Sequence, residues 1–337
     1  MNVHKSLLCG LLLLALGGDA FAAAKELVVY SARKEHLIKN VFEKYTAETG
    51  VKIKYTTNKA GALLTQIKNE GKSSPADVFM TVDAGYLWHA ANEGVLAPAN
   101  SKVLNDNIPE HLRDPQGRWF GLSVRARTIV YNTSKPKNIL RQLSTYEDLA
   151  DPKWKGRLCL RTSKKVYNQS LVAMLMVQYG EKETEKIVSQ WVNNLATDVF
   201  PNDTKVIKAV ASGQCDVGIV NTYYFGRLKE KEPDLKIGLF WPNQKNDGGV
   251  HVNVSGAGVV KTSMRQAEAV KFLEWLSSDK TQKIFAEVNH EYPAKTGVPI
   301  SKIVASWGTF TPSRINLAKA GQNQAAAIKL MDRAKYR

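Results

Sequence analysis

Two adjacent tyrosines, Tyr223 and Tyr224, follow a short apolar run, 217–220, of the kind that fills a buried strand. A third tyrosine, Tyr167, lies in a polar turn just before the helical run 171–176. Segments that follow a strand are where an α/β sheet presents groups to a ligand. Aromatic packing is the simpler interpretation of one such pair, but three phenols on loop-like segments predict a site for a hard cation.

Several tyrosines at one site have a specific chemical use. A free phenol has a pKa of about 10, so it ionises at neutral pH only when a strong Lewis acid such as ferric iron holds the phenolate. Soft or borderline metals would require cysteines or clustered histidines, and the sequence provides neither cluster. We interpret His89, His111, His251 and His290 as structural or exposed, because none has the helical i,i+4 spacing of metal ligands.

Six segments together resemble the periplasmic ferric-iron-binding proteins of bacterial iron-uptake ABC transporters, which are tyrosine-ligand, transferrin-like solute-binding proteins. The resemblance extends in order over essentially the whole mature chain. The segments that carry it are 28–33, 74–79, 125–127, 163–170, 213–224 and 291–293.

The resemblance implies a ligand set for one ferric ion. Tyr167, Tyr223 and Tyr224 would be the phenolate ligands, all from the second lobe, and three phenolates would balance the charge of the ion. Arg33 and Arg125 match the arginines that hold a synergistic anion in the family, and a planar guanidinium binds carbonate or a carboxylate in a fork. The expected cargo is therefore Fe(III) with carbonate or a similar anion.

The sequence departs from some relatives immediately after the Tyr-Ser-x-Arg turn at residues 30–33. Certain family members carry a His or a His-Tyr pair there, but this chain has Lys34 and Glu35. We therefore expect the ion to be held by one lobe plus an anion or water. Glu35 and the neighbouring His36 are weaker candidates for an extra ligand, and Arg127 could share or replace the anion-binding role.

The charge of the chain is compatible with attraction of anionic iron chelates or of the membrane surface. The 337 residues carry a formal net charge of +16, and a positive field attracts anions. However, the basic residues are scattered among acidic ones, without the basic runs or the aromatic motifs of nucleic-acid-binding modules. A nucleic-acid partner is not expected.

The first 23 residues have the pattern of a cleaved secretory signal, with Lys5, the apolar run 7–16 and a small-residue ending. The apolar run is too short to span a membrane and no longer one follows it, so we expect a periplasmic protein without stable membrane insertion. Two cysteines remain after cleavage, Cys159 and Cys215. In an exported protein they favour a disulfide, and two buried free thiols are the alternative.

The order of elements predicts an α/β fold. Strands and helices alternate as β-α-β-α-β over residues 26–82, which indicates parallel strands, and 123–131 reads as a long strand. With a second crossover implied by the resemblance at 251–260, we expect a two-lobed periplasmic solute-binding protein with doubly wound sheets and a two-strand hinge. The expected parts are the signal 1–23, a first lobe of 24–125 plus 251–300, and a second lobe of 126–250 plus 301–337 that carries the tyrosines.

The expected function is that of a monomeric carrier, not an enzyme, which captures ferric iron and delivers it to an ABC permease in the inner membrane. Two alternatives stay open. One is a binding protein of the same fold for another solute, such as an organic polyanion or an iron chelate. The other is an exported hydrolase, although the sequence contains no nucleophile elbow, zinc-protease motif or P-loop.

Overall fold

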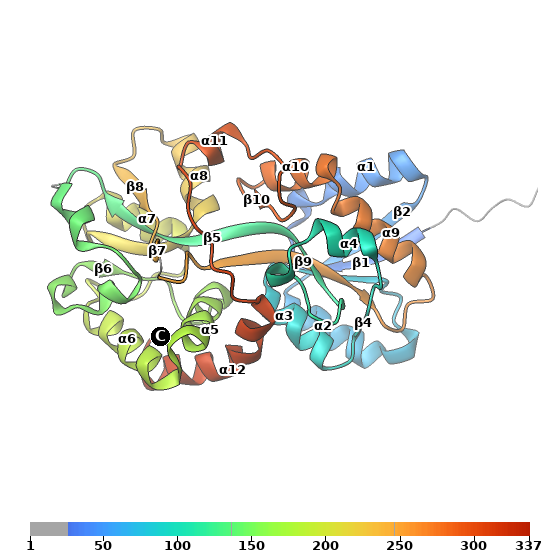
Figure 1. Cartoon of the computed structure of the whole chain (residues 1–337), viewed down its shortest axis with the longest axis horizontal. Helices are drawn as coiled ribbons and strands as arrows, with labels where there is room; N and C mark the ends of the chain where they lie inside the picture. The colour runs from blue at the N-terminus through green and yellow to red at the C-terminus, as the bar shows by residue number, and fades with distance from the viewer. Residues whose placement is uncertain (1–25, 136, 246) are drawn as a thin grey trace, which may run out of the picture.

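The computed structural model describes residues 26–135, 137–245 and 247–337, and it forms a mixed α/β structure of two lobes (Figure 1). The predicted signal, residues 1–23, lies outside the described residues. Within the described ranges, no helix combines the length and the apolar character that crossing a bilayer requires.

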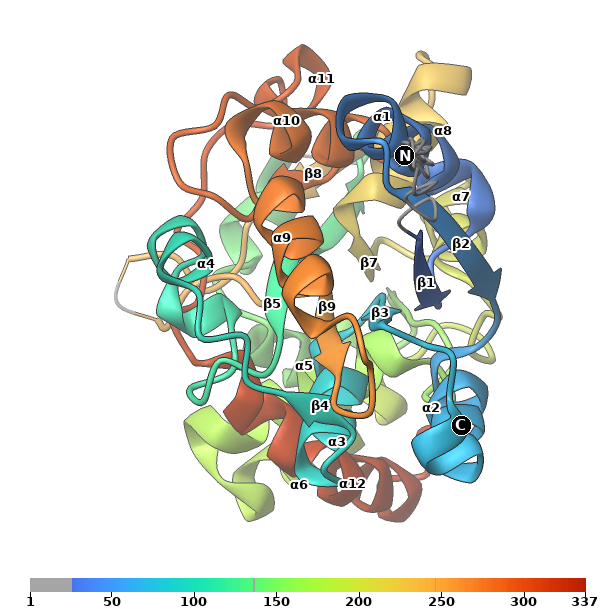
Figure 2. The ribbon, with the colours of Figure 1, turned by 90° about the vertical axis from the view of Figure 1, so that its right-hand side faces the viewer.

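The first lobe is built around three parallel strands. Its elements are β1 (Glu26–Ser31), α1 (Lys39–Thr49), β2 (Lys52–Thr57), α2 (Ala60–Glu70), β3 (Val78–Thr81), α3 (Ala84–Asn92), β4 (Leu96–Ala97), α4 (Lys102–Asn107), α9 (Gln266–Leu276), α10 (Asp279–Glu287) and β10 (Tyr292–Pro293). β1 pairs in parallel with β2 on one side and β3 on the other, which confirms the predicted order. Leu27 and Val29 of β1 share a core with Leu63 and Ile67 of α2. Figure 2 shows α1 and α10 on one face of this sheet and α2 and α3 on the other.

Two long strands, β5 (Phe120–Asn132) and β9 (Val252–Val260), occupy the hinge. Residues 120–126 of β5 pair with β9 in the first sheet, and residues 127–132 pair with strands of the second. The sheet therefore continues from one lobe to the other through β5, which runs from the second lobe to the edge of the first in Figure 1. The second predicted strand is also present as β9, which pairs with β3, β4 and β5 in the first sheet.

The second lobe adds strands to the other end of β5. Its elements are β6 (Leu158–Cys159), α5 (Val166–Tyr179), α6 (Glu181–Asn193), α7 (Asp203–Ala211), β7 (Val217–Asn221), α8 (Thr222–Lys231) and β8 (Ile237–Phe240). The main path through the sheet is β2-β1-β3-β9-β5-β7-β6. A separate core of buried side chains, including Trp154, Leu175 and Trp191, supports this lobe.

The sequence predicted that the tyrosines lie in polar turns, and this prediction is wrong. α5 begins at Val166 and α8 begins at Thr222, so that Tyr167 and the Tyr223–Tyr224 pair occupy first helical turns. The extended backbone ends at Lys165 and at Asn221 in the two segments. Residues 165–167 and 221–224 contain no glycine or proline that would delay the helix, so each helix extends back through its tyrosines.

The last part of the chain is only partly helical. Between α11 (Lys302–Ala305) and α12 (Leu317–Arg333), residues 306–316 form an irregular strap that contains Gly308 and Pro312, residues that interrupt a helix. α12 packs against α5 of the second lobe and α3 of the first. Because it contacts both lobes, the expected boundaries between them stay a prediction.

The predicted disulfide between Cys159 and Cys215 is present, and it joins the end of β6 to the residues before β7. We expect the oxidised protein to show no free thiol, and reduction to lower the free energy of unfolding by about 2–4 kcal/mol, because the bridge restricts the unfolded chain. Thiol titration combined with denaturant unfolding before and after reduction measures both quantities. Two thiols that titrate in the native unreduced protein would contradict the prediction.

Candidate metal centre

The three predicted tyrosines meet in one cavity of 180 Å³. Tyr167 reaches it from α5, and Tyr223 and Tyr224 reach it from α8, which starts directly after β7. The cavity is lined from both lobes, by Ala32, Arg33, Lys34, Leu37, Val82, Arg125, Tyr167, Tyr223, Tyr224, Arg227, Ser255, Asn289 and Glu291. The structure therefore brings together all five residues that the sequence assigned to the site.

The tyrosine rings are closely packed. The centroids of the Tyr223 and Tyr224 rings lie 4.4 Å apart, and the side-chain amide of Asn221 donates to the Tyr223 hydroxyl at 3.3 Å. All three tyrosines belong to first helical turns, where the backbone dipole favours negative charge. The arrangement suits phenolates that form when a cation binds.

Without a bound cation, raised pKa values keep the phenols of Tyr167 and Tyr223 protonated at neutral pH. Burial raises the pKa of Tyr167, and the neighbouring Arg125 partly opposes this effect. Burial together with the Tyr167 and Tyr224 phenols raises the pKa of Tyr223 well above its ordinary value. Loading a ferric ion must therefore displace protons from these phenols.

The two arginines assigned to the anion retain free hydrogen-bonding capacity. Arg125 donates through Nη2 to Asp83 at 3.2 Å, and Arg33 donates through Nη1 to Ser123 and to Glu291, each at 3.1 Å. Among the described residues, Nη1 of Arg125 and both Nε and Nη2 of Arg33 are buried without a partner. Buried donors of this kind are normally satisfied, so these nitrogens fit a small anion in the cavity.

The guanidinium of Arg127 forms hydrogen bonds away from the cavity. Its guanidinium donates to Asp203, Asn221 and Asn168, and it forms a buried ion pair with Asp203 at 3.2 Å. These bonds fix the end of β7 beneath the tyrosine pair. The expectation that Arg127 shares the anion-binding role is therefore not supported.

Neither Glu35 nor the buried His251 is placed as a metal ligand. Glu35 accepts a hydrogen bond from the Tyr55 hydroxyl at 3.0 Å and does not line the cavity. His251 is buried, and burial beside Arg125 lowers its pKa to about 3, so that its ring is neutral. In the part of the chain that the structure describes, no three His, Cys, Asp or Glu side chains are placed to hold a metal.

Sequence reasoning missed three charged residues of the site. The guanidinium of Arg227 lies 5.2 Å from the Tyr223 ring, and that of Arg161 lies 5.2 Å from the Tyr167 ring. Glu291, whose pKa is lowered chiefly by Arg33 against the effect of burial, supplies the carboxylate of the lining. The position of Arg227 four residues after Tyr223 on a helix was a usable signal, and Glu291 lies in the segment 291–293 that carries part of the resemblance. Arg161 depends on tertiary contacts.

Asp83 ties the lobes together beneath the cavity. Its fully buried carboxylate accepts hydrogen bonds from Arg125, from Asn253 at 2.9 Å and from Ser170 at 2.8 Å. Ser170 is three residues after Tyr167 on α5, on the same face of the helix. Asp83 therefore fixes both an anion-site arginine and the helix that carries a ligand tyrosine.

Comparison with known proteins places the chain in context. A family model described as "Bacterial extracellular solute-binding protein" matches residues 73–310. "Iron uptake protein A1" of Synechocystis is 46% identical, over 95% of this chain and 89% of its own length. "Major ferric iron-binding protein" of Neisseria meningitidis is 29% identical, over 85% and 88% respectively.

Solved structures agree with the fold. A Trichodesmium protein, "(IdiA) (FutA) in complex with iron and citrate ligands", superimposes with a TM-score of 0.88 at 45% identity, over 93% of this chain and 100% of its own. Ferric iron-binding protein A of Mannheimia haemolytica in an open conformation gives 0.85 at 37% identity, over 93% and 99%. These similarities confirm the predicted two-lobed α/β fold class.

Proposed function

The chain belongs to the family of bacterial extracellular solute-binding proteins, and from this premise we propose that it captures ferric iron between its lobes through Tyr167, Tyr223 and Tyr224. A small anion held by Arg33 and Arg125 completes the coordination. The protein acts in the periplasm as a monomeric carrier without catalytic activity, and it delivers the ion to an ABC permease of the inner membrane.

The observation that carries this proposal is that three phenols from two helices line one cavity, which residues of both lobes enclose. Oxygen ligands suit a hard, highly charged ion, and three phenolates neutralise Fe(III). The relatives named for iron uptake and ferric binding support the same cargo.

The charge of the lining supports a bound anion. Arg33, Lys34, Arg125 and Arg227 supply four positive charges, and Glu291 supplies one negative charge, so that the lining carries a formal net charge of +3 when the phenols are neutral. A neutral assembly of the ion and three phenolates leaves this excess unchanged. Carbonate bound by the fork of Arg125 would reduce it.

The proposal is tested with Arg125 variants. We expect bicarbonate to raise the ferric affinity of the wild-type protein, and we expect Arg125→Ala to lose most of this benefit. Because Arg125→Ala leaves Asp83 buried without its partner and costs about 3–5 kcal/mol, Arg125→Lys serves as a second variant that keeps the charge but not the fork. Arg333→Ala, on the surface of α12, is the matched control.

Ferric affinity is measured by competition with a chelator for each protein, with and without bicarbonate. The proposal predicts a bicarbonate effect in the wild type and in Arg333→Ala that is reduced in both Arg125 variants. Equal affinities in all conditions would show that no anion takes part in the site.

A second candidate cargo is a ferric chelate with carboxylate groups. The cationic excess of the lining favours it, and the Trichodesmium relative is described with iron and citrate together. Equilibrium dialysis with labelled citrate distinguishes a ferric chelate from a ferric ion bound with carbonate. A chelate cargo requires the protein to retain citrate in proportion to iron. An ion bound with carbonate requires no retained citrate.

A further inference from the structure

A second cavity lies behind the hinge, on the opposite face of its strands from the tyrosine cavity. On β5, Arg125 lines the tyrosine cavity and the adjacent Val124 lines the second one. On β9, Ser255 lines the tyrosine cavity and Val252 lines the second cavity. Successive side chains of a strand point to opposite faces, so the sheet separates the two cavities.

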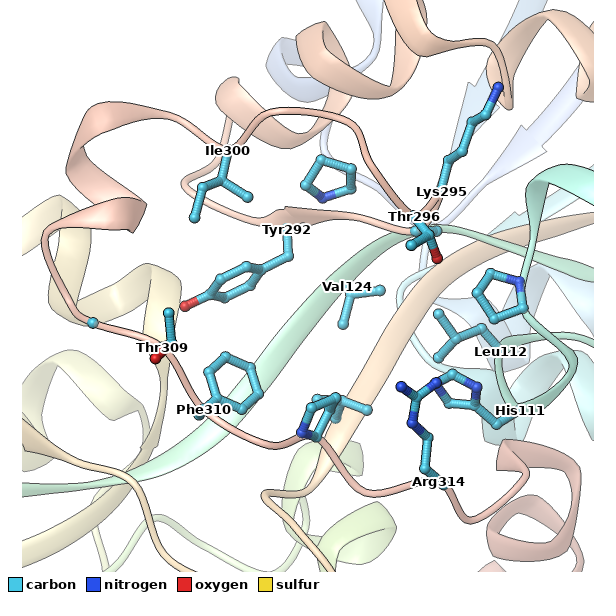
Figure 3. Close-up of a pocket in the computed structure, with 16 residues that line it drawn as sticks. His111, Leu112, Val124, Tyr292, Lys295, Thr296, Ile300, Thr309, Phe310 and Arg314 are labelled. Atoms are coloured by element: carbon cyan, nitrogen blue, oxygen red, sulfur yellow. The ribbon is translucent and has the colours of Figure 1, made fainter. Parts of the chain in front are cut away.

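The second cavity has mainly apolar walls and a volume of 310 Å³, which is at the lower end of the range of about 300–1,000 Å³ for small-molecule sites. Figure 3 shows Val124, Leu112, Tyr292 and Phe310 around it. The Phe310 ring stacks on Trp241 with centroids 4.3 Å apart, and this contact anchors the strap that forms one wall. Aliphatic and aromatic walls of this kind suit an aromatic ring.

The hydroxyl of Tyr292 makes one end of the cavity polar. The hydroxyl oxygen of Tyr292 is buried and has no partner among the described residues, although buried hydroxyls normally form hydrogen bonds. In Figure 3 its ring extends across the cavity toward Thr309. A ligand with a polar substituent at this end would satisfy the hydroxyl.

The other end is cationic. Arg314 and His111 lie side by side there in Figure 3, and no lining residue is acidic. Burial and the charge of Arg314 lower the pKa of His111, so that Arg314 carries the charge and the neutral ring can donate a hydrogen bond. Lys295 does not contribute, because its ammonium pairs with Asp279 at 2.5 Å.

We propose that this cavity is a second ligand site, which binds a small aromatic carboxylate. The ring packs among Val124, Tyr292 and Phe310, and the guanidinium of Arg314 holds the carboxylate, to which it can donate two parallel hydrogen bonds. A hydroxyl on the far side of the ring meets the Tyr292 hydroxyl. This site is independent of the proposed iron cargo, because it shares no lining residue with the tyrosine cavity.

The probe is 6-hydroxy-2-naphthoate, and its neutral amide is the matched compound. Binding of each to the purified protein is measured by isothermal titration calorimetry. We expect one naphthoate per chain, and we expect Arg314→Gln to weaken its binding about tenfold, as loss of a charge-assisted bond at a rim implies. Arg314→Gln should leave the weaker binding of the amide unchanged. Thr309→Trp, at the exposed mouth, should block both compounds.

Lys302→Gln removes a positive charge from the exposed side of α11 and is the control, with unchanged binding expected. Arg125→Lys tests whether the probe enters the cationic tyrosine cavity instead. Failure of the naphthoate to bind at millimolar concentration would overturn the proposal. Naphthoate binding that is insensitive to Arg314→Gln and Thr309→Trp, or weakened by Arg125→Lys, would also overturn it.

Discussion

Replacement of Tyr223 or Tyr224 by phenylalanine is expected to weaken ferric binding by more than about 100-fold, which is the upper end of the loss caused by removing an outer-shell partner of a metal ligand. Phenylalanine keeps the ring packing of the pair and deletes only the ligand oxygen. The free energy of unfolding should change by less than about 1.5 kcal/mol, the net value of one hydrogen bond. Chelator competition and denaturant unfolding measure the two effects.

Tyr179→Phe is the matched control for these variants. Tyr179 is the last residue of α5, the helix that carries Tyr167 near its start, and it does not line the cavity. Its loss should leave ferric affinity unchanged. Retained affinity in both Tyr223→Phe and Tyr224→Phe would remove the pair from the ligand set and leave the packing interpretation.

Acidification is expected to release iron steeply. The phenols of Tyr167 and Tyr223 have raised pKa values in the iron-free protein, so they hold protons at neutral pH and must lose them on binding. Each displaced proton lowers the apparent affinity about tenfold per pH unit of acidification, and three phenols give about 1,000-fold. Protonation of carbonate acts in the same direction.

This pH dependence is measured by counting protons. A pH-stat titration with a ferric chelate, corrected for protonation of the released chelator and for the proton that bicarbonate loses when it binds as carbonate, should give about three protons per ion from the phenols at neutral pH. Tyr223→Phe should release one proton fewer. A release close to zero would mean that the ion is held by groups already ionised, such as Glu291, and would contradict the ligand set.

Much of the site could be predicted from sequence because its determinants are local. Tyr223 and Tyr224 follow a buried strand, which predicted that they lie at the end of that strand, where a sheet presents groups to a ligand. Two cysteines in an exported chain suggested the disulfide. The resemblance then selected Tyr167, Arg33 and Arg125. All five of these side chains line one cavity.

The missed features depend on contacts between distant segments. Arg161 and Glu291 approach the tyrosines only after the lobes fold, and Asp83 acquires its role from Ser170 and Asn253, which are 87 and 170 residues away in sequence. No spacing rule reports such contacts. The start of the helix after Tyr167 was placed too late for a different reason, since polar residues ahead of an apolar run read equally well as a turn or as a first helical turn. The helix that begins at Thr222 was not predicted.

The most direct test of the central claim is a titration of the purified protein with ferric iron in bicarbonate buffer, followed by visible absorbance. A phenolate bound to Fe(III) absorbs visible light, whereas carboxylate, water and organic solutes in this site would not. The account predicts a band that grows to saturation at one ion per chain and is shifted or lost in Tyr223→Phe and Tyr224→Phe. Iron that binds without a visible band would contradict it.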